Sequence, residues 1–235
     1  MLSENELKSL VLKKGGFSEE ENLRILKRFI NRTNTLEYFF KKYNLYNKKA
    51  LEIGSSYGQD LIHFSKDSIG IEFEEKMVKF SKNLGCNVIQ LNIENTELPF
   101  EEKLFDIFYG ADILIHMVSP FKLLLEARYL LKDDGILLLQ FPSSSPFFKK
   151  DHTVLHFYTF NHRTIKMTIE NAGFEILEIT SRVRRKGNFI NKIFYPLLTR
   201  YGNHLWIVAK KAEMKVDHTR SQKPDWVRSR IWLQK

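Results

Sequence analysis

The chain has 235 residues, of which 43% are hydrophobic, so it can bury one sizeable core and we expect a single main domain. No apolar run of about 18 residues or more occurs, which argues against a transmembrane span, and the charged start "MLSENELKSLVLKK" predicts no signal peptide. A single cysteine, Cys86, excludes an internal disulfide framework and a cysteine-based metal cage. These features predict a soluble, cytoplasmic protein without a bound metal.

The net charge of +9 is concentrated in the C-terminal quarter. Residues 181–211 carry eight Lys or Arg and no acid, and residues 212–235 carry six against three acids. The first 180 residues therefore carry a net charge of −2. A basic quarter is consistent with a solvated surface, an anionic substrate, a nucleic acid or an anionic membrane surface, and the sequence leaves all four open.

Residues 1–47 predict an N-terminal helical cap. Leu7 and Val11, and later Leu26 and Ile30, lie at the spacing of one helix face. Ser18 precedes three glutamates, a composition typical of an N-cap followed by an acidic first turn.

From residue 48 onward, short apolar runs alternate with amphipathic helices. The runs that predict strands are "KALEI", "SIGIEF", "NVIQL", "FDIFYGA", "GILLLQF", "FEILEIT" and "HLWIVAKK". Helices are predicted from Tyr57 to Phe64 and over "EKMVKFSKNL", "PFKLLLEARYLL" and "HRTIKMTIENA". Strands buried on both faces and separated by helices predict a doubly wound α/β sheet with helices on both faces.

The end of the chain departs from this alternation. An insertion over residues 183–203, with Pro196 inside it, separates the last two strands. We therefore expect a terminal hairpin in which the last strand is antiparallel. A basic tail over residues 212–235 follows the domain.

The segment after the first strand has the form of a ligand-binding loop. Glu52, Gly54 and Gly58 form Glu-x-Gly-x-x-x-Gly, whereas a dinucleotide loop would have glycine where Ser56 and Gln59 stand. A carboxylate at a strand end repels a pyrophosphate and suits a ligand that presents an ammonium group. The loop therefore disfavours a nicotinamide-dependent dehydrogenase.

Six motifs in order resemble those of class I S-adenosylmethionine-dependent methyltransferases. They are "LEIGSSYG", "IGIEF", "LNIENTELPF", "FDIFYGADILIHM", "LLLEARYLLKDDGILLLQFP" and "HFYTFNHRTIKMTIENAGFEI". The subgroup that they resemble is methyltransferase type 11, which includes the ubiquinone-biosynthesis methyltransferases. The resemblance implies a Rossmann-like domain over residues 48–211 with a seven-stranded sheet, and S-adenosylmethionine as the cofactor, which is released as S-adenosylhomocysteine.

The resemblance also implies a set of cofactor-binding residues. Glu72 would bond both ribose hydroxyls, and Asn92 would accept from the adenine amino group in place of the usual aspartate. Ser56 replaces the usual middle glycine, which is tolerable if the loop needs no positive φ there. The implied set is Glu52, Gly54, Ser55, Ser56, Tyr57, Gly58, Glu72, Phe73, Asn92, Ile93, Gly110 and Ala111.

The methyl acceptor is less well defined by the sequence. His116 and His152 are candidates for the base that removes its proton, with His156 a weaker one, and the alternative is that His116 packs under the cofactor. The three histidines do not have the spacing of a metal site. Aromatic and basic residues in 143–160 and 183–203 suit a small-molecule, lipid-linked or sugar-linked acceptor, methylated on oxygen or carbon, and allow peripheral contact with a membrane.

Two other functions stay open. The basic quarter could track the phosphates of tRNA or another nucleic acid, although the chain lacks an Asn-Pro-Pro-Tyr signature and a separate RNA-binding module. A non-catalytic partner protein with this fold is the second alternative, and the intact Glu52, Gly54, Gly58 and Glu72 argue against it. The sequence does not indicate the oligomeric state.

Overall fold

The computed structural model describes residues 1–142, 157–180 and 204–213. His152, His156, the expected insertion at 183–203 and nearly all of the expected tail lie outside these residues. Within the described residues, no helix is both long enough and apolar enough to cross a membrane.

The strands form one seven-stranded sheet in the order β3-β2-β1-β4-β5-β7-β6. They are β1 (Ala50–Ile53), β2 (Ile69–Glu72), β3 (Val88–Gln90), β4 (Phe105–Ala111), β5 (Leu131–Pro142), β6 (Phe174–Thr180) and β7 (His204–Lys211). The first five are parallel, and β7 runs antiparallel to both β5 and β6. The predicted sheet and its antiparallel last strand are therefore confirmed. The chain order reverses between β1 and β4, which is where ligands bind in sheets of this kind.

The helices are those that the sequence predicts, with one exception. They are α1 (Glu4–Lys14), α2 (Glu19–Tyr43), α3 (Glu75–Asn83), α4 (Pro120–Leu130) and α5 (His162–Asn171), with short 3-10 helices η1 (Leu61–His63) and η2 (Leu114–His116). The hydroxyl of Ser18 accepts a hydrogen bond from the backbone of Glu21 at 3.2 Å, which confirms it as the N-cap of α2.

The expected helix from Tyr57 to Phe64 is wrong, because only the short η1 forms there. Gly58 has a φ of +78°, which a helix cannot accommodate. The ring of Tyr57 is buried among α1, α2 and α3, where it packs edge-on against Phe80 at 5.2 Å between centroids. Packing of this tyrosine against the N-terminal helices overrides the local helical pattern.

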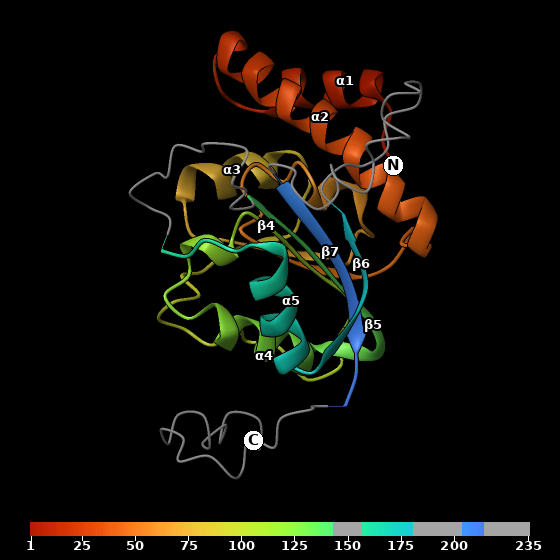
Figure 1. Cartoon of the computed structure of the whole chain (residues 1–235). Helices are drawn as coiled ribbons and strands as arrows, with labels where there is room; N and C mark the ends of the chain where they lie inside the picture. Colours follow the sequence, from red (N-terminus) through yellow and green to blue (C-terminus); the bar gives the residue numbers. More distant parts are fainter. Residues whose placement is uncertain (143–156, 181–203, 214–235) are drawn as a thin grey trace.

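Helices cover both faces of the sheet, as Figure 1 shows. On one face, α2 packs Leu36, Phe39 and Phe40 against Tyr109 and Trp206 of the sheet. Both α1 and α3 lie with α2 in a smaller cluster on this side. On the opposite face, α4 and α5 join the largest hydrophobic cluster. The N-terminal helices are therefore part of the core and not an appendage.

Candidate functional site

The loop after β1 turns through three left-handed residues. Gly54, Ser56 and Gly58 have φ values of +71°, +49° and +78°. The backbone N–H groups of Gly54 and Ser55 both donate to the carbonyl of Ile71, at 2.8 and 3.0 Å. These bonds hold the loop on the end of β2, at the carboxyl edge of the parallel strands.

Ser56 is strained, because the loop requires the positive φ that a glycine would supply without cost. A left-handed residue other than glycine costs about 1–2 kcal/mol. Bonds on both sides hold it: its N–H donates to Oε2 of Glu72 at 2.8 Å, and its carbonyl accepts from the hydroxyl of Ser81 at 2.9 Å. The loop therefore does require a positive φ at this position, and these two hydrogen bonds are what hold the serine there.

The Glu72 carboxylate organises the loop as well as the end of β2. Besides the bond from Ser56, its Oε1 accepts from the N–H groups of Phe73 at 2.9 Å and Glu74 at 3.0 Å. The residue is 7% exposed. A carboxylate has about four acceptor positions, so these three bonds leave room for one more donor. The acid is fixed in place and can still accept a ligand hydroxyl.

Phe73 presents an exposed aromatic ring beside this acid. The residue is 65% exposed, which is unusual for phenylalanine. Asn92, after β3, is also exposed, and its Oδ1 accepts from the backbone of Glu94 at 3.1 Å. Ile93 instead packs against the main core. An exposed ring beside a fixed carboxylate suits a nucleoside, whose base stacks while its sugar is bonded.

Glu52 is buried at the end of β1. It is 1% exposed, and within the described residues its Oε2 has no hydrogen-bond partner. Burial, together with the nearby Asp60 carboxylate, raises the pKa of Glu52 well above the usual range, although the Arg32 guanidinium acts in the opposite direction. An orphaned carboxyl oxygen at this position can accept from a ligand ammonium group.

The end of β4 lies against the glycine loop. Gly110 is level with Ile53 of β1 in the sheet register. The Ile113 side chain lies 3.3 Å from the position that a Cβ on Gly54 would take, and 2.9 Å from that of a Cβ on Gly110. Ala111 follows and is half-buried, paired with Gln140 of β5. The small residues at these strand ends thus border the loop.

Two loop residues of the expected set face inward. Ser55 is fully buried, and its hydroxyl lies against the Cα side of Gly70 on β2. Tyr57 is in the cluster beneath the N-terminal helices.

His116 is exposed at the end of η2, and its backbone N–H donates to the carbonyl of Ile113 at 3.0 Å. The structure therefore brings together the loop backbone, Glu52, Glu72, Phe73 and Gly110.

A buried polar network behind the loop was not expected from the sequence. Nε and Nη2 of Arg32, on α2, donate to the Asp60 carboxylate at 2.6–3.0 Å, and Nη1 donates to Oε1 of Gln140 at 2.9 Å. Nη2 also contacts the Tyr109 hydroxyl, which itself donates to Asp60 at 2.7 Å. The signal in the sequence is slight: an arginine on an otherwise apolar helix face, and an acid two residues after Gly58.

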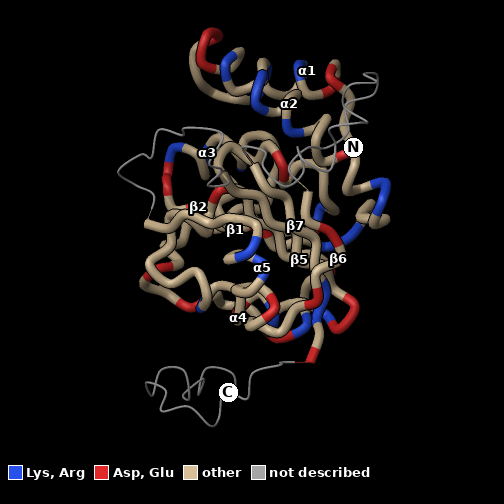
Figure 2. The backbone as a smooth tube through the Cα atoms, viewed as in Figure 1, with Lys and Arg blue, Asp and Glu red and all other residues tan. Residues whose placement is uncertain are grey.

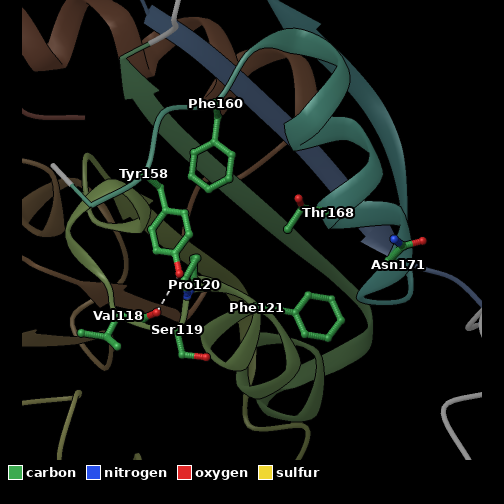
Figure 3. Close-up of a pocket in the computed structure, with 8 residues that line it drawn as sticks. All are labelled: Val118, Ser119, Pro120, Phe121, Tyr158, Phe160, Thr168 and Asn171. Atoms are coloured by element: carbon green, nitrogen blue, oxygen red, sulfur yellow. Dashed lines mark hydrogen bonds between the residues drawn. The ribbon is translucent and has the colours of Figure 1, made fainter. Parts of the chain in front are cut away.

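A separate open groove lies between α4 and α5, on the other face of the sheet (Figure 3). It is lined by Val118, Ser119, Pro120, Phe121, Tyr158, Phe160, Thr168 and Asn171. The hydroxyl of Tyr158 closes one end by donating to the carbonyl of Val118 at 2.9 Å. None of the expected cofactor residues lines this groove.

Comparison with known proteins gives a consistent result. Residues 51–139 match the sequence model of the family described as "Methyltransferase domain". An uncharacterised protein of Methanocaldococcus jannaschii is 25% identical over 153 residues, which cover 62% of this chain and 73% of that protein.

Solved structures share the fold at low sequence identity. A chain of the complex that contains the Haloferax volcanii Trm112 methyltransferase activator superposes with a TM-score of 0.58 at 14% identity, covering 79% of this chain and 93% of that one. An S-adenosylmethionine-dependent methyltransferase of Archaeoglobus fulgidus gives a TM-score of 0.57 at 17% identity, covering 78% and 99%.

Residues 51–139 thus match the sequence model of a methyltransferase domain, and the chain has the fold of the class I S-adenosylmethionine-dependent methyltransferases. S-adenosylmethionine is the cofactor that this family and fold imply. The residues at the strand ends fit it: Glu52 has an orphaned oxygen for the ammonium group, Glu72 has a free acceptor position for the ribose, and Phe73 has an exposed ring for the base.

Proposed function

We propose that the protein transfers a methyl group from S-adenosylmethionine to a small, partly apolar acceptor. The observation that carries this proposal is the Glu72 carboxylate, which fixes the glycine loop through Ser56 and stands beside the exposed ring of Phe73. Together they offer a bound nucleoside a fixed acceptor for its sugar and an aromatic face for its base.

When bound, the cofactor supplies an electrophilic methyl group on a positively charged sulfur. The chain's own contribution is alignment: Glu72 and Phe73 hold the nucleoside, and Glu52 and the loop hold the amino-acid part. Alignment and exclusion of water can lower a barrier by roughly 7–11 kcal/mol. The same set of groups would bind cofactor in a non-catalytic protein, so binding and transfer need separate tests.

Exposed apolar side chains near three strand ends support an acceptor with an apolar body. Besides Phe73 after β2, Val118 after η2 is 65% exposed and Phe157 is 63% exposed. Glu94 accepts from the N–H of Val118 at 2.8 Å, and the N–H of Phe157 donates to the carbonyl of Ile115 at 2.8 Å. These bonds bring the segments after β3 and β4 and the segment before α5 to the same rim. Lipid-linked or sugar-linked small molecules fit such a rim.

A nucleic-acid acceptor would need a surface with many cations, and most of the chain's surplus lies in residues 181–235. Acidic and basic side chains are interspersed over the described residues, as Figure 2 shows. A steep loss of tRNA binding between about 50 and 200 mM salt would favour that alternative. Binding that is absent or insensitive to salt would favour the small acceptor.

The first experiment is calorimetric titration of S-adenosylmethionine and S-adenosylhomocysteine into the wild type and Phe73→Ala. Because the ring is exposed, its loss should change the free energy of unfolding by no more than about 0.5 kcal/mol. It should weaken both ligands by roughly 5- to 150-fold, since base–aromatic stacking is worth about 1–3 kcal/mol. Leu177→Ala, an exposed residue on β6, is the matched control and should leave both affinities unchanged.

Failure of the wild type to bind either ligand would refute the proposed function. Binding without transfer of a radiolabelled methyl group to a panel of phenols, sugar nucleotides, isoprenoid lipids and tRNA would favour the non-catalytic alternative. Transfer to one class of the panel would identify the acceptor.

A further inference from the structure

The turn after β4 carries an aspartate in the left-handed conformation. Asp112 has a φ of +57°, which aspartate and asparagine adopt more readily than other residues that carry a side chain. Its N–H donates to the carbonyl of Gln140 at 2.7 Å, which holds the backbone in this conformation. The next residue, Ile113, contacts Gly54 and Gly110, so Asp112 stands beside the glycine loop.

Gln140 fixes the direction of the Asp112 carboxylate. Gln140 is 3% exposed, and its Oε1 accepts from Nη1 of Arg32 at 2.9 Å. A guanidinium only donates, so the amide oxygen must face Arg32 and the NH₂ group must face the other way. That NH₂ group donates to Oδ1 of Asp112 at 3.0 Å and contacts Nδ1 of His204 at 2.8 Å. These bonds determine the orientation of the amide.

The second carboxylate oxygen is available for a ligand. Asp112 is half-buried, and within the described residues only its Oδ1 and its N–H are bonded. Oδ2 therefore stands at the carboxyl edge of β4 with acceptor capacity to spare.

We propose that Asp112 binds the nucleophilic group of the methyl acceptor, with Gln140 and Arg32 as positioning residues. The acceptor's nucleophilic group is then an O–H or N–H that donates a hydrogen bond to the carboxylate. This inference rests on the proposed function. It replaces His116 with Asp112 as the group that receives the acceptor's proton.

A lone pair on the acceptor's oxygen or nitrogen forms the bond to the methyl carbon, and the carbon–sulfur bond breaks with its electron pair left on sulfur. The acceptor's proton passes to Oδ2 of Asp112 and from there to water. A base held in this way contributes roughly 10²- to 10⁴-fold to the rate.

The test uses sinefungin, a cofactor analogue that carries an amine where the cofactor carries its methylsulfonium. An ammonium at that position should contact Oδ2 of Asp112, so the wild type should bind sinefungin about 10- to 100-fold more tightly than S-adenosylhomocysteine, the usual gain from a charge-assisted hydrogen bond. Asp112→Asn should bring the two affinities together and leave that for S-adenosylhomocysteine within about twofold. Asparagine adopts positive φ readily and keeps an oxygen for Gln140, so the turn is preserved.

Two further variants separate a local contact from a general effect. Asp106→Asn removes a carboxylate at the opposite end of β4, where it is bonded to Lys49 and Lys132, and should leave the affinity ratio unchanged. Gln140→Leu should lower the ratio by freeing the Asp112 carboxylate, whereas a purely structural role for Gln140 would weaken both ligands equally.

An unchanged ratio in Asp112→Asn, or an equal fall in Asp106→Asn, would overturn the inference while leaving the proposed function intact. If the wild type binds neither S-adenosylmethionine nor S-adenosylhomocysteine, the proposed function itself fails. The two failures are therefore distinguishable in the same set of titrations.

Discussion

Replacing Arg32 with methionine should destabilise the protein by breaking a buried ion pair. Nη2 of Arg32 lies 2.6 Å from Oδ2 of Asp60, and the Asp60 side chain is fully buried. Methionine keeps the apolar stem of the arginine but removes all of its donors. The Asp60 carboxylate would then be left with the hydroxyl of Tyr109 as its side-chain partner.

The size of the effect follows from the burial of the pair. Removing one partner of a buried ion pair costs about 3–5 kcal/mol, against a total stability of roughly 5–15 kcal/mol for a folded domain. For a chain of this length each kcal/mol lowers the melting temperature by about 2–4 °C, so Arg32→Met should lower it by about 6–20 °C. Asp60→Asn should have a comparable effect, because it removes the carboxylate that is bonded directly to the guanidinium.

The double variant Arg32→Met/Asp60→Asn removes both charges and keeps an amide oxygen for Tyr109, so it should be more stable than the sum of the single changes implies. Thermal unfolding of all four proteins at pH 7, followed by circular dichroism, measures the coupling. Arg24→Met, which breaks an exposed pair with Glu21, is the control and should cost less than about 1 kcal/mol. A loss below about 1 kcal/mol in Arg32→Met, or strict additivity in the double variant, would refute the reasoning.

Three further changes test the electrostatics and the loop. Burial lowers the pKa of His63 to about 4, so on acidification the unfolded chain takes up the proton before the folded protein does. Between pH 6.5 and 4 the free energy of unfolding of the wild type, measured by urea titration, should therefore fall by about 3 kcal/mol relative to that of His63→Gln. Glu52 should act in the opposite direction, because its raised pKa makes the free energy of unfolding fall as the pH rises above 4.5. The free energy of unfolding of Glu52→Gln should therefore increase relative to that of the wild type towards neutral pH. A difference between the two proteins that does not change with pH would contradict this. Gly54→Ala should cost about 1–2 kcal/mol and weaken S-adenosylhomocysteine more than tenfold, because the methyl group would lie 3.3 Å from Ile113. Gly85→Ala, at φ +89° with open space around it, should show the strain without the loss of affinity.

The sheet could be predicted because its signals are local. Apolar runs such as "GILLLQF" are read directly from neighbouring residues. The long interval before the last strand was sufficient to predict that this strand runs antiparallel. The segment after Tyr57 shows the limit. Its helical pattern is genuine, but the ring packs against Phe80 and the N-terminal helices, and this contact is invisible to any window of the sequence.

The candidate site divides in the same way. The positions of Glu52, Gly54 and Glu72 follow from strand ends and glycine spacing, which a sequence displays. The direction of a side chain does not, so Ser55 and Tyr57 could not be told apart from ligand-facing residues. The positive φ of Ser56 could not be predicted either, because the serine gives no sign of the left-handed turn that glycine would have indicated. The network of Arg32 joins residues 28 and 108 positions apart, and no periodic pattern marks such pairs.

The antiparallel insertion of β7 between β5 and β6 has a consequence for how this scaffold can be modified. Because His204 is paired with Pro142, and Thr180 with Trp206, the chain leaves β5 and β6 and enters β7 at one edge of the sheet, the edge that holds the glycine loop. The splice points on either side of residues 181–203, and the one after β5, therefore lie at this same edge. Residues 143–156 or 181–203 could be exchanged as cassettes between relatives with the seven strands left untouched.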